Sequence, residues 1–413
     1  MVYKHLFTGI LITGCSFVLS AQKQTERIWE HHPLPNNATA NIKGIAFDLN
    51  GAMLIAINGV GVGGYRYIEA DDWTAFISTE HHHDMDGINE IGCDVSSCVA
   101  VDYLNNVWFG SNSHGISVLT DTTWRHITEK KGLINNSIRQ ILIIRDTTWV
   151  ATGGGVVKIV GDSIINYPIT GYSRDTNITC LTFDLSGNLW VGTTNGIFKF
   201  DGTTWSSRHR PVNSGGLDAN YTDAITVDSK GNIWAAMYKQ GIYKFDGKDW
   251  KLQFSKESTD FTCLIFDKKG NLWAGTTTKG VWEYNGTYWM NYISDMIFNN
   301  SVYSIAVKDD VVWIGCRGGL TKVYEKTISY LIDSKENTPV SIYPNPVRNQ
   351  FTASNVENAM LFLYTISGQK IGTYYSLGKD LTIDASPFEQ GIYILKIENN
   401  DKTTSTFKIS VIR

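Results

Sequence analysis

The sequence predicts an all-β protein, a seven-bladed β-propeller followed by a small Ig-like β-sandwich, and three features support this fold class. A motif of about 40 residues recurs within residues 22–332. Eleven of the 13 tryptophans fall at two positions of that motif, so their abundance has a structural cause. After residue 338 short alternating strands continue without the motif, as expected for a second domain.

The repeat is clearest in residues 178–205, where Asp184 opens a tight turn, Trp190 follows, and Gly196 begins another apolar run. Three or four short strands fit this length. One set of hairpins is only marginally stable without similar neighbours. Seven units are present; six carry an inner tryptophan and one has Leu54 at that position. The inner tryptophans are Trp108, Trp149, Trp190, Trp234, Trp273 and Trp313. This period predicts a propeller.

A small residue recurs at one position near the start of the units, four residues before the turn aspartate in most of them. The residues are Gly44, Cys98, Cys180, Ala224, Cys263 and Ser304. Innermost propeller strands crowd around a central axis, so we expect these residues to lie there. The repeat thus explains three of the six cysteines by their size. A disulfide between Cys93 and Cys98 is an alternative use of Cys98 in an oxidising compartment.

The first 21 residues have the pattern of a signal peptide. Lys4 precedes an apolar run that is too short for a membrane span, and Ser20-Ala21 offers small residues for cleavage. A lipoprotein signal that places lipid on Cys15 is the alternative, and either interpretation predicts export.

The segment around Trp29 resembles the end of a repeat unit that lacks its beginning. A propeller ring closes best when one blade takes strands from both ends of the chain, because this pairs an otherwise open edge. We therefore expect the Trp29 strand to complete the blade that begins at Val302. The alternative is that residues 327–331 supply that outer strand.

Several other features argue for particular functions or against them. The net charge is −4 with no basic run, which argues against a nucleic-acid partner. Residues 81–86 (His-His-His-Asp-Met-Asp) contain metal-ligand types, but adjacent side chains cannot converge on one ion, so a solvated loop is favoured. The GxGxxG match at residues 59–64 lacks a following helix and indicates a turn. No catalytic motif was found, so we predict no enzyme activity, catalytic residue, metal or cofactor.

Residues 333–338 indicate a linker and residues 339–413 a separate β-sandwich domain. Four motifs of this domain resemble the C-terminal sorting domain of the type IX secretion system of Bacteroidetes. They are Tyr343-Pro344-Asn345-Pro346, Ile366-Ser367-Gly368-Gln369, Gly391-Ile392-Tyr393 and Lys408-Ile409-Ser410. The resemblance implies passage through the periplasm, recognition by the outer-membrane translocon and removal by its C-terminal signal peptidase. The protein would then be secreted or attached to lipopolysaccharide at the outer-membrane surface.

The propeller units resemble the two-component regulator propeller repeat, on Asn188-Leu189-Trp190-Val191-Gly192-Thr193 and Gly196-Ile197-Phe198-Lys199-Phe200. The resemblance implies a ligand-sensing fold. Because no internal membrane span or kinase region accompanies the propeller, we do not expect signalling by phosphotransfer.

The residues just before the repeat glycine form a predicted ring at one mouth of the propeller, together with two nearby residues. The candidates are His114, Asn195, Tyr238, Gln240, Lys279 and Arg317, with Gly154 and Gly318 at the same ring position. They vary while the framework repeats, as expected of a binding rim.

The sequence therefore predicts an exported, monomeric, non-catalytic protein that binds a glycan or a peptide. The alternatives are a propeller-fold lyase or hydrolase, which would carry paired carboxylates in the channel, and an accessory subunit of the secretion apparatus.

Overall fold

The computed structural model describes residues 3–6, 22–35, 38–58, 62–67, 72–77, 89–92, 95–169, 177–206, 209, 220–256, 259–330, 340–399 and 404–413. The chain divides into two compact units, one containing Lys23–Ser329 and the other Tyr330–Arg413. In these described ranges the helical structure is limited to 3-10 turns, such as Glu129–Lys131. No helix among them is long and apolar enough to span a membrane. The protein is therefore all-β, as predicted.

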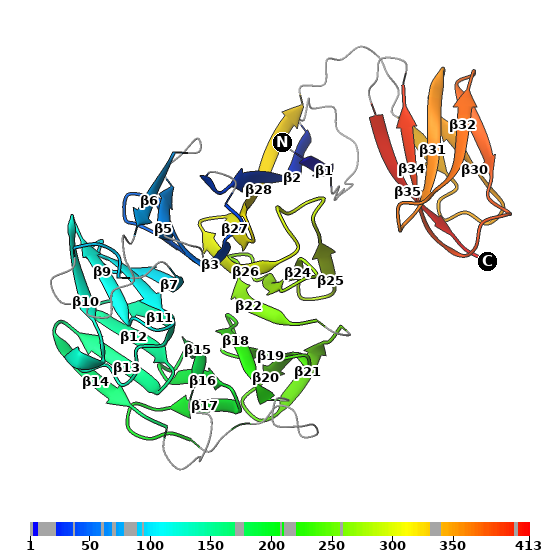
Figure 1. The fold of residues 1–413 in the computed structure, drawn as a ribbon. Helices are drawn as coiled ribbons and strands as arrows, with labels where there is room; N and C mark the ends of the chain where they lie inside the picture. The colour runs from blue at the N-terminus through cyan, green and yellow to red at the C-terminus, as the bar shows by residue number, and fades with distance from the viewer. Residues whose placement is uncertain are drawn as a thin grey trace. The chain divides into compact units, whose positions relative to one another are not determined.

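The first unit consists of seven antiparallel sheets, the blades, arranged around a central axis (Figure 1). Blade 1 has β3 (Asn41–Phe47), β4 (Met53–Asn58), β5 (Val62–Tyr67) and β6 (Trp73–Ile77). Blade 2 has β7 (Ser96–Val101), β8 (Val107–Ser111), β9 (Ile116–Thr120) and β10 (Thr123–Ile127). Blade 3 has β11 (Ile138–Ile144), β12 (Thr147–Thr152), β13 (Gly155–Val160) and β14 (Ser163–Tyr167). Blade 4 has β15 (Ile178–Phe183), β16 (Leu189–Thr193) and β17 (Gly196–Phe200).

The remaining three blades complete the ring. Blade 5 has β18 (Thr222–Val227), β19 (Ile233–Met237), β20 (Gly241–Phe245) and β21 (Trp250–Phe254). Blade 6 has β22 (Phe261–Phe266), β23 (Leu272–Thr276), β24 (Val281–Tyr284) and β25 (Trp289–Tyr292). Blade 7 has β26 (Val302–Lys308), β27 (Val311–Cys316), β28 (Gly319–Tyr330), β2 (Gln22–Pro33) and β1 (Tyr3–Leu6), in this spatial order. The prediction of seven blades is confirmed.

Blade 7 takes strands from both ends of the propeller, because β2 lies beside β28. The prediction that the Trp29 strand completes this blade is confirmed. Trp29 is 1% exposed and its ring centroid lies 4.7 Å from that of Tyr292 in blade 6. Arg27 donates to Glu283 at 2.6 and 3.1 Å, and the Glu283 side chain is 1% exposed. The N-terminal strand is thus held by ring packing and by a buried ion pair.

The turn aspartates have the structural role that the repeat predicts. Asp184 accepts hydrogen bonds from the backbone N–H groups of Ser186 and Asn188 at 2.9 Å, and from Trp190 Nε1 at 2.9 Å. The same bond to the inner tryptophan recurs in blades 2, 5 and 6 at 2.9–3.0 Å. Blade 1 has Leu54 at that position, and there Arg66 donates to Asp48 instead, at 2.7 Å. Each carboxylate therefore joins a turn to a strand of its own blade.

The small residues of the innermost strands are crowded by the neighbouring blade. A Cβ added at Gly192, opposite Cys180, would lie 2.5 Å from the Cys180 sulfur and 2.7 Å from Thr222 of blade 5. A Cβ added at Gly275 would likewise lie too close to the Cys263 sulfur and to Val302 of the next blade. Blade 3 has the larger Gln140 at this position, and its Oε1 accepts from the Leu181 N–H at 2.8 Å. The glycines opposite the small residues are thus crowded both by their own blade and by the next one.

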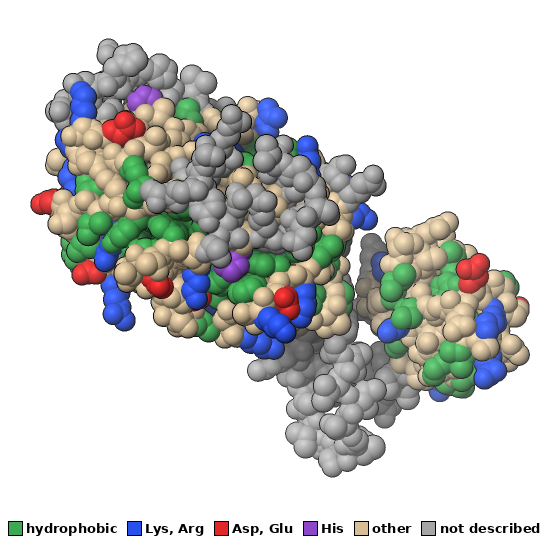
Figure 2. All heavy atoms as spheres, turned by 90° about the horizontal axis from the view of Figure 1, so that it is seen from below, with side chains coloured by type: hydrophobic (Ala, Val, Ile, Leu, Met, Phe, Trp, Pro, Cys, Tyr) green, Lys and Arg blue, Asp and Glu red, His purple; other side chains and the backbone are tan. Residues whose placement is uncertain are grey.

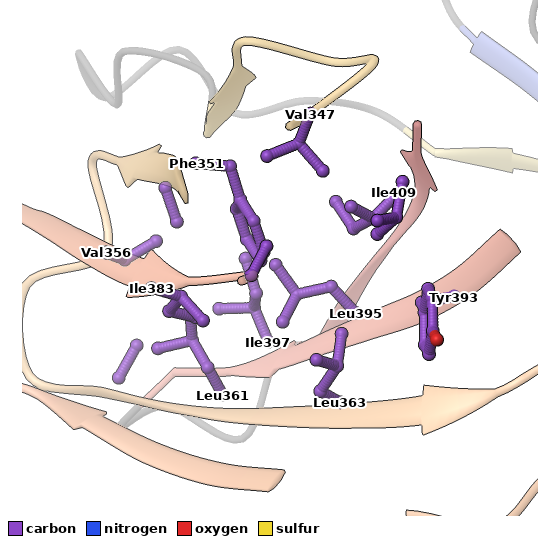
Figure 3. Close-up of a cluster of buried hydrophobic side chains, with 14 residues drawn as sticks. Val347, Phe351, Val356, Leu361, Leu363, Ile383, Tyr393, Leu395, Ile397 and Ile409 are labelled. Atoms are coloured by element: carbon purple, nitrogen blue, oxygen red, sulfur yellow. The ribbon is translucent and has the colours of Figure 1, made fainter. Parts of the chain in front are cut away.

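The second unit packs two sheets face to face. One has β29 (Ser341–Tyr343), β30 (Gln350–Ser354) and β33 (Asp380–Asp384). The other has β32 (Lys370–Ser376), β31 (Ala359–Thr365), β34 (Gly391–Glu398) and β35 (Thr404–Val411). Phe351 lies fully buried among Val356, Leu361, Ile383 and Leu395 (Figure 3). Alternating side chains of the two sheets make this core, as in an Ig-like β-sandwich.

Candidate functional site: the propeller channel

A channel of about 500 Å³ runs between the innermost strands of the propeller. In every blade the innermost strand has a register shift at the same place, one residue before the small position. The residue at the shift is the extra residue of a β-bulge, and bulges re-aim side chains. The seven channel residues are Lys43, Ser97, Arg139, Thr179, Asp223, Thr262 and Tyr303. They form a ring inside the channel.

Three of the seven are hydroxyl residues that connect one blade to the next. The side chains of Ser97, Thr179 and Thr262 donate to backbone carbonyls of Ile138, Thr222 and Val302 at 2.5–2.7 Å. These bonds hold alternate blade pairs together, so we assign these residues a structural role. The other four channel residues, Lys43, Arg139, Asp223 and Tyr303, are charged or aromatic.

The cationic side of the channel is formed by blades 1, 3 and 7. Lys43 Nζ lies 4.1 Å from the centroid of the Tyr303 ring, a cation–π contact. Burial, and then the nearby Arg139, lower the pKa of Lys43. Arg139 itself donates to Asn112 at 3.2 Å. Two like charges therefore face the same part of the channel.

The acidic side of the channel is formed by blades 5 and 6. Burial, and then repulsion from Asp260, raise the pKa of Asp223 to about 7. Asp223 Oδ2 and Asp260 Oδ1 are buried and accept no hydrogen bond from the described residues. Within the described ranges neither carboxylate forms an ion pair with Lys43 or Arg139. The channel thus holds basic and acidic groups that no ion pair compensates among the described residues.

The predicted rim loops lie beside the entry of the innermost strands. The N–H groups of Tyr238, Thr277 and Arg317 donate to carbonyls of Tyr221, Asp260 and Ser301 at 2.8–3.0 Å. Loops between strands and connections between blades therefore share one face.

The structure separates the six rim candidates by environment. Tyr238 is half-buried, and its ring lies 5.8 Å from that of Tyr221, next to the acidic side. Arg317 is exposed, and His114, Gln240 and Lys279 are half-buried in turns. Asn195 is only 9% exposed. Tyr238 thus contacts Tyr221, which lies two residues before the channel residue Asp223 in the chain.

The residues predicted from the sequence do not include Lys43, Arg139, Asp223, Asp260 and Tyr303. A signal for most of them exists, because the residue before each small position varies in charge and size while the strand around it repeats. Asp260 has no such signal, since it meets Asp223 only through the packing of adjacent blades.

Two predicted regions fall largely outside the described residues. They are His81–Asp86 and most of Met1–Ala21, including Cys15, so the solvated loop and the signal cleavage remain predictions. Cys93 and residues 331–339 also lie outside them, so the disulfide and the linker are not tested. On the face drawn in Figure 2, Lys and Arg side chains are scattered among acidic ones rather than gathered in one patch.

The sorting-motif residues of the second unit come together at one end of the sandwich. Asn345 donates to the carbonyl of Lys408 at 2.6 Å and accepts from the N–H of Ser410 at 2.9 Å. The Tyr343-Pro344 and Asn345-Pro346 peptide bonds are both cis. Motifs that lie far apart in sequence are thus joined directly.

The remaining motif residues support the surrounding turns and strands. Tyr393 is 9% exposed and donates to the Glu389 carbonyl at 2.9 Å. Gly368 has a φ of 86°, as its tight turn requires. Gly391 pairs with Val411 in the sheet, and Lys408 is exposed.

Comparison with known structures shows the propeller fold. Virginiamycin B lyase from Staphylococcus aureus, solved as an inactive variant with quinupristin, is similar with a TM-score of 0.58 and 12% identity, covering 72% of this chain and 99% of that chain. The extracellular domain of BT3049 from B. thetaiotaomicron, described as a hybrid two component system, has a TM-score of 0.57 and 17% identity. The match covers 93% of this chain and 60% of that chain. YCF48 from Cyanidioschyzon merolae has a TM-score of 0.55 and 12% identity, covering 72% and 98%. At these identities the likeness concerns the fold alone.

Sequence families give a more specific result. No curated protein is significantly similar to the chain. Residues 255–278 match the two component regulator propeller family, as the repeat residues suggested. Residues 341–412 match the secretion system C-terminal sorting domain, which indicates export and a secreted or cell-surface location. The chain is thus an exported β-propeller with a two component regulator propeller repeat and a C-terminal secretion sorting domain.

Proposed function

We propose that the propeller is a non-catalytic binding domain whose ligand, a glycan or a peptide, enters the channel from the rim face. The observation that carries this proposal is that Lys43 and Arg139 line one side of the channel and Asp223, next to Asp260, lines another, with no ion pair between the two sides among the described residues. Uncompensated buried charges cost stability. A ligand that neutralises them would offset this cost.

The rim residues would make the outer contacts of the same ligand. Arg317, Lys279 and His114 suit an acidic or polar group, and Tyr238 suits a ring or a cation. Gln240 and Asn195 would add hydrogen bonds. A volume of about 500 Å³ falls within the range of small-molecule sites, so the channel would hold one residue or a short end of a longer ligand.

The binding test uses the full secreted chain on glycan and peptide arrays. We expect the Asp223→Asn and Arg139→Gln variants to lose at least tenfold in affinity for whichever ligand the array identifies. The controls are Asp162→Asn and Lys230→Gln, which change exposed charges outside the channel. Binding that the channel variants leave unchanged would contradict the channel site. Binding unaffected by a triple substitution of His114, Lys279 and Arg317 would contradict the rim.

We further propose that the translocon and the C-terminal signal peptidase of the type IX secretion system recognise the second unit, with transfer to surface lipopolysaccharide as one outcome. The support is the sorting-domain match over residues 341–412. A mass spectrum of the protein from cells and from medium tests this. An intact C-terminus with no attached sugar in both fractions would contradict removal.

An enzyme that cleaves glycans by acid–base chemistry is the second candidate. It is favoured by the Asp223–Asp260 pair, because a carboxyl with a pKa near 7 can donate a proton at neutral pH. Turnover of an array ligand by the wild type, lost in Asp223→Asn and Asp260→Asn, would establish this function and overturn the non-catalytic one.

A further inference from the structure

The charges in the channel are arranged as two opposite poles. Lys43 and Arg139 belong to blades 1 and 3, whereas Asp223 and Asp260 belong to blades 5 and 6. The two poles are therefore separated by at least one intervening blade on either side of the ring. Lys43, Arg139 and Asp223 line the same channel, so the poles face the same space.

The poles do not neutralise each other. Among the described residues no ion pair crosses the channel, although Lys43, Arg139 and Asp223 all line it. A direct ion pair between Lys43 and Asp223 would be more stable in a purely structural channel, because it would compensate two partly buried charges. Elsewhere in the propeller the chain does make such a pair, between Arg27 and Glu283. The separation in the channel leaves both poles available to a ligand.

The polar groups of the poles point to the ligand chemistry. The oxygens Asp223 Oδ2 and Asp260 Oδ1 are buried and accept no hydrogen bond in the described part of the chain, so they suit a group with several N–H donors. An ammonium group offers three donors and a positive charge. Arg139 and Lys43 on the opposite side suit a carboxylate. A neutral sugar would leave both poles uncompensated.

We infer that the channel binds a compact zwitterion, with its ammonium group at Asp223 and Asp260 and its carboxylate at Arg139 and Lys43. Free amino acids and short peptides with both termini free carry this chemistry. The inference rests on the proposed binding function of the channel and specifies its ligand class. Tyr303, held against Lys43, supplies an aromatic wall beside the carboxylate pole.

Isothermal titration of the full secreted chain tests this inference with matched ligands. The probes are a mixture of free amino acids, L-alanyl-L-alanine, its N-acetyl derivative and its C-terminal amide. We expect the N-acetyl group and the C-terminal amide each to weaken binding of the dipeptide at least tenfold, because each modification removes one charge. Binding of the dipeptide but not the amino acids would identify peptide ends as the source, and the reverse would identify free amino acids.

Variants connect each pole to its ligand group. Asp223→Asn should lower the affinity for the free dipeptide at least tenfold, yet change that for the N-acetyl derivative less than threefold. Arg139→Gln should lower the affinity for the free dipeptide at least tenfold, yet change that for the C-terminal amide less than threefold. Equal losses for capped and free ligands would overturn the assignment of the poles. Thermal melting of each variant checks that it is folded, and Thr203→Ser, in an exposed turn, is the control.

The outcomes separate this inference from the proposed function. If no zwitterion binds but an array ligand binds in a manner sensitive to Asp223→Asn, the ligand class is wrong and the channel site stands. If no probe or array ligand depends on Asp223 or Arg139, both are overturned.

Discussion

Replacing Arg27 by methionine tests how the propeller ring is closed. The substitution keeps an apolar stem but leaves Glu283, whose side chain is 1% exposed, without its cation. Breaking a buried ion pair by removing one partner costs about 3–5 kcal/mol, and we expect the lower end, about 3 kcal/mol, because Arg27 is 22% exposed. For a unit of roughly 300 residues the entropy of unfolding is about 0.6 kcal/mol per degree, so the melting temperature should fall by about 5 °C.

Differential scanning calorimetry of the full chain measures this fall. The double variant Arg27→Met, Glu283→Gln should recover at least half of the loss, because no uncompensated charge then remains buried. The matched control is Lys268→Met, which breaks an exposed ion pair with Asp309 at 3.4 Å and should cost less than about 0.5 kcal/mol. A melting temperature for Arg27→Met no lower than that of the control would refute the proposed role of this ion pair in closing the ring.

Three further outcomes are expected. Asp184→Ala should lower the free energy of unfolding by about 2 kcal/mol in urea titration, because it removes the bonds to the turn and to Trp190; a loss below about 0.5 kcal/mol would show that the turn holds without them. Gly192→Ala should cost about 1–3 kcal/mol through its clash with Cys180, and Cys180→Ala should restore part of this; an additive double variant would argue against this contact within blade 4. The pKa of Asp223, about 7, lies above its unfolded value of about 4, so its contribution to stability is present below pH 4 and lost as the pH rises to 7. Asp223→Asn should therefore reduce the fall in the free energy of unfolding between about pH 4 and pH 7. An unchanged slope in this pH range would contradict the raised pKa.

The number of blades could be predicted from the sequence because each blade repeats the same local chemistry. Trp190 and its equivalents are fixed by the turn aspartate six positions earlier, and both residues are visible in one short stretch. The shared blade was also predictable, since Trp29 repeats the end of a unit. Local pairs of this kind leave a trace in a single sequence.

The channel could not be predicted in the same way. A bulge breaks the alternation of a strand, so Arg139 and Asp223 reach the channel although simple alternation does not reveal it. The partnership of Asp223 with Asp260 depends on how blades 5 and 6 pack, and no sequence pattern encodes it. Gln140 is a further exception, because its amide satisfies a backbone donor at a position that is small in the other six blades.

The blade shared by both ends of the propeller sets an order on assembly. A chain that leaves a membrane with its amino end first presents β2 long before β28 has emerged, so the edge of β2 that pairs with β28 stays open until then. Contacts between segments this far apart form slowly because the intervening loop must first be closed. The ring can therefore close only after the chain has emerged as far as residue 330. The sorting domain follows this point in the chain, so it emerges after the last strand that the ring needs.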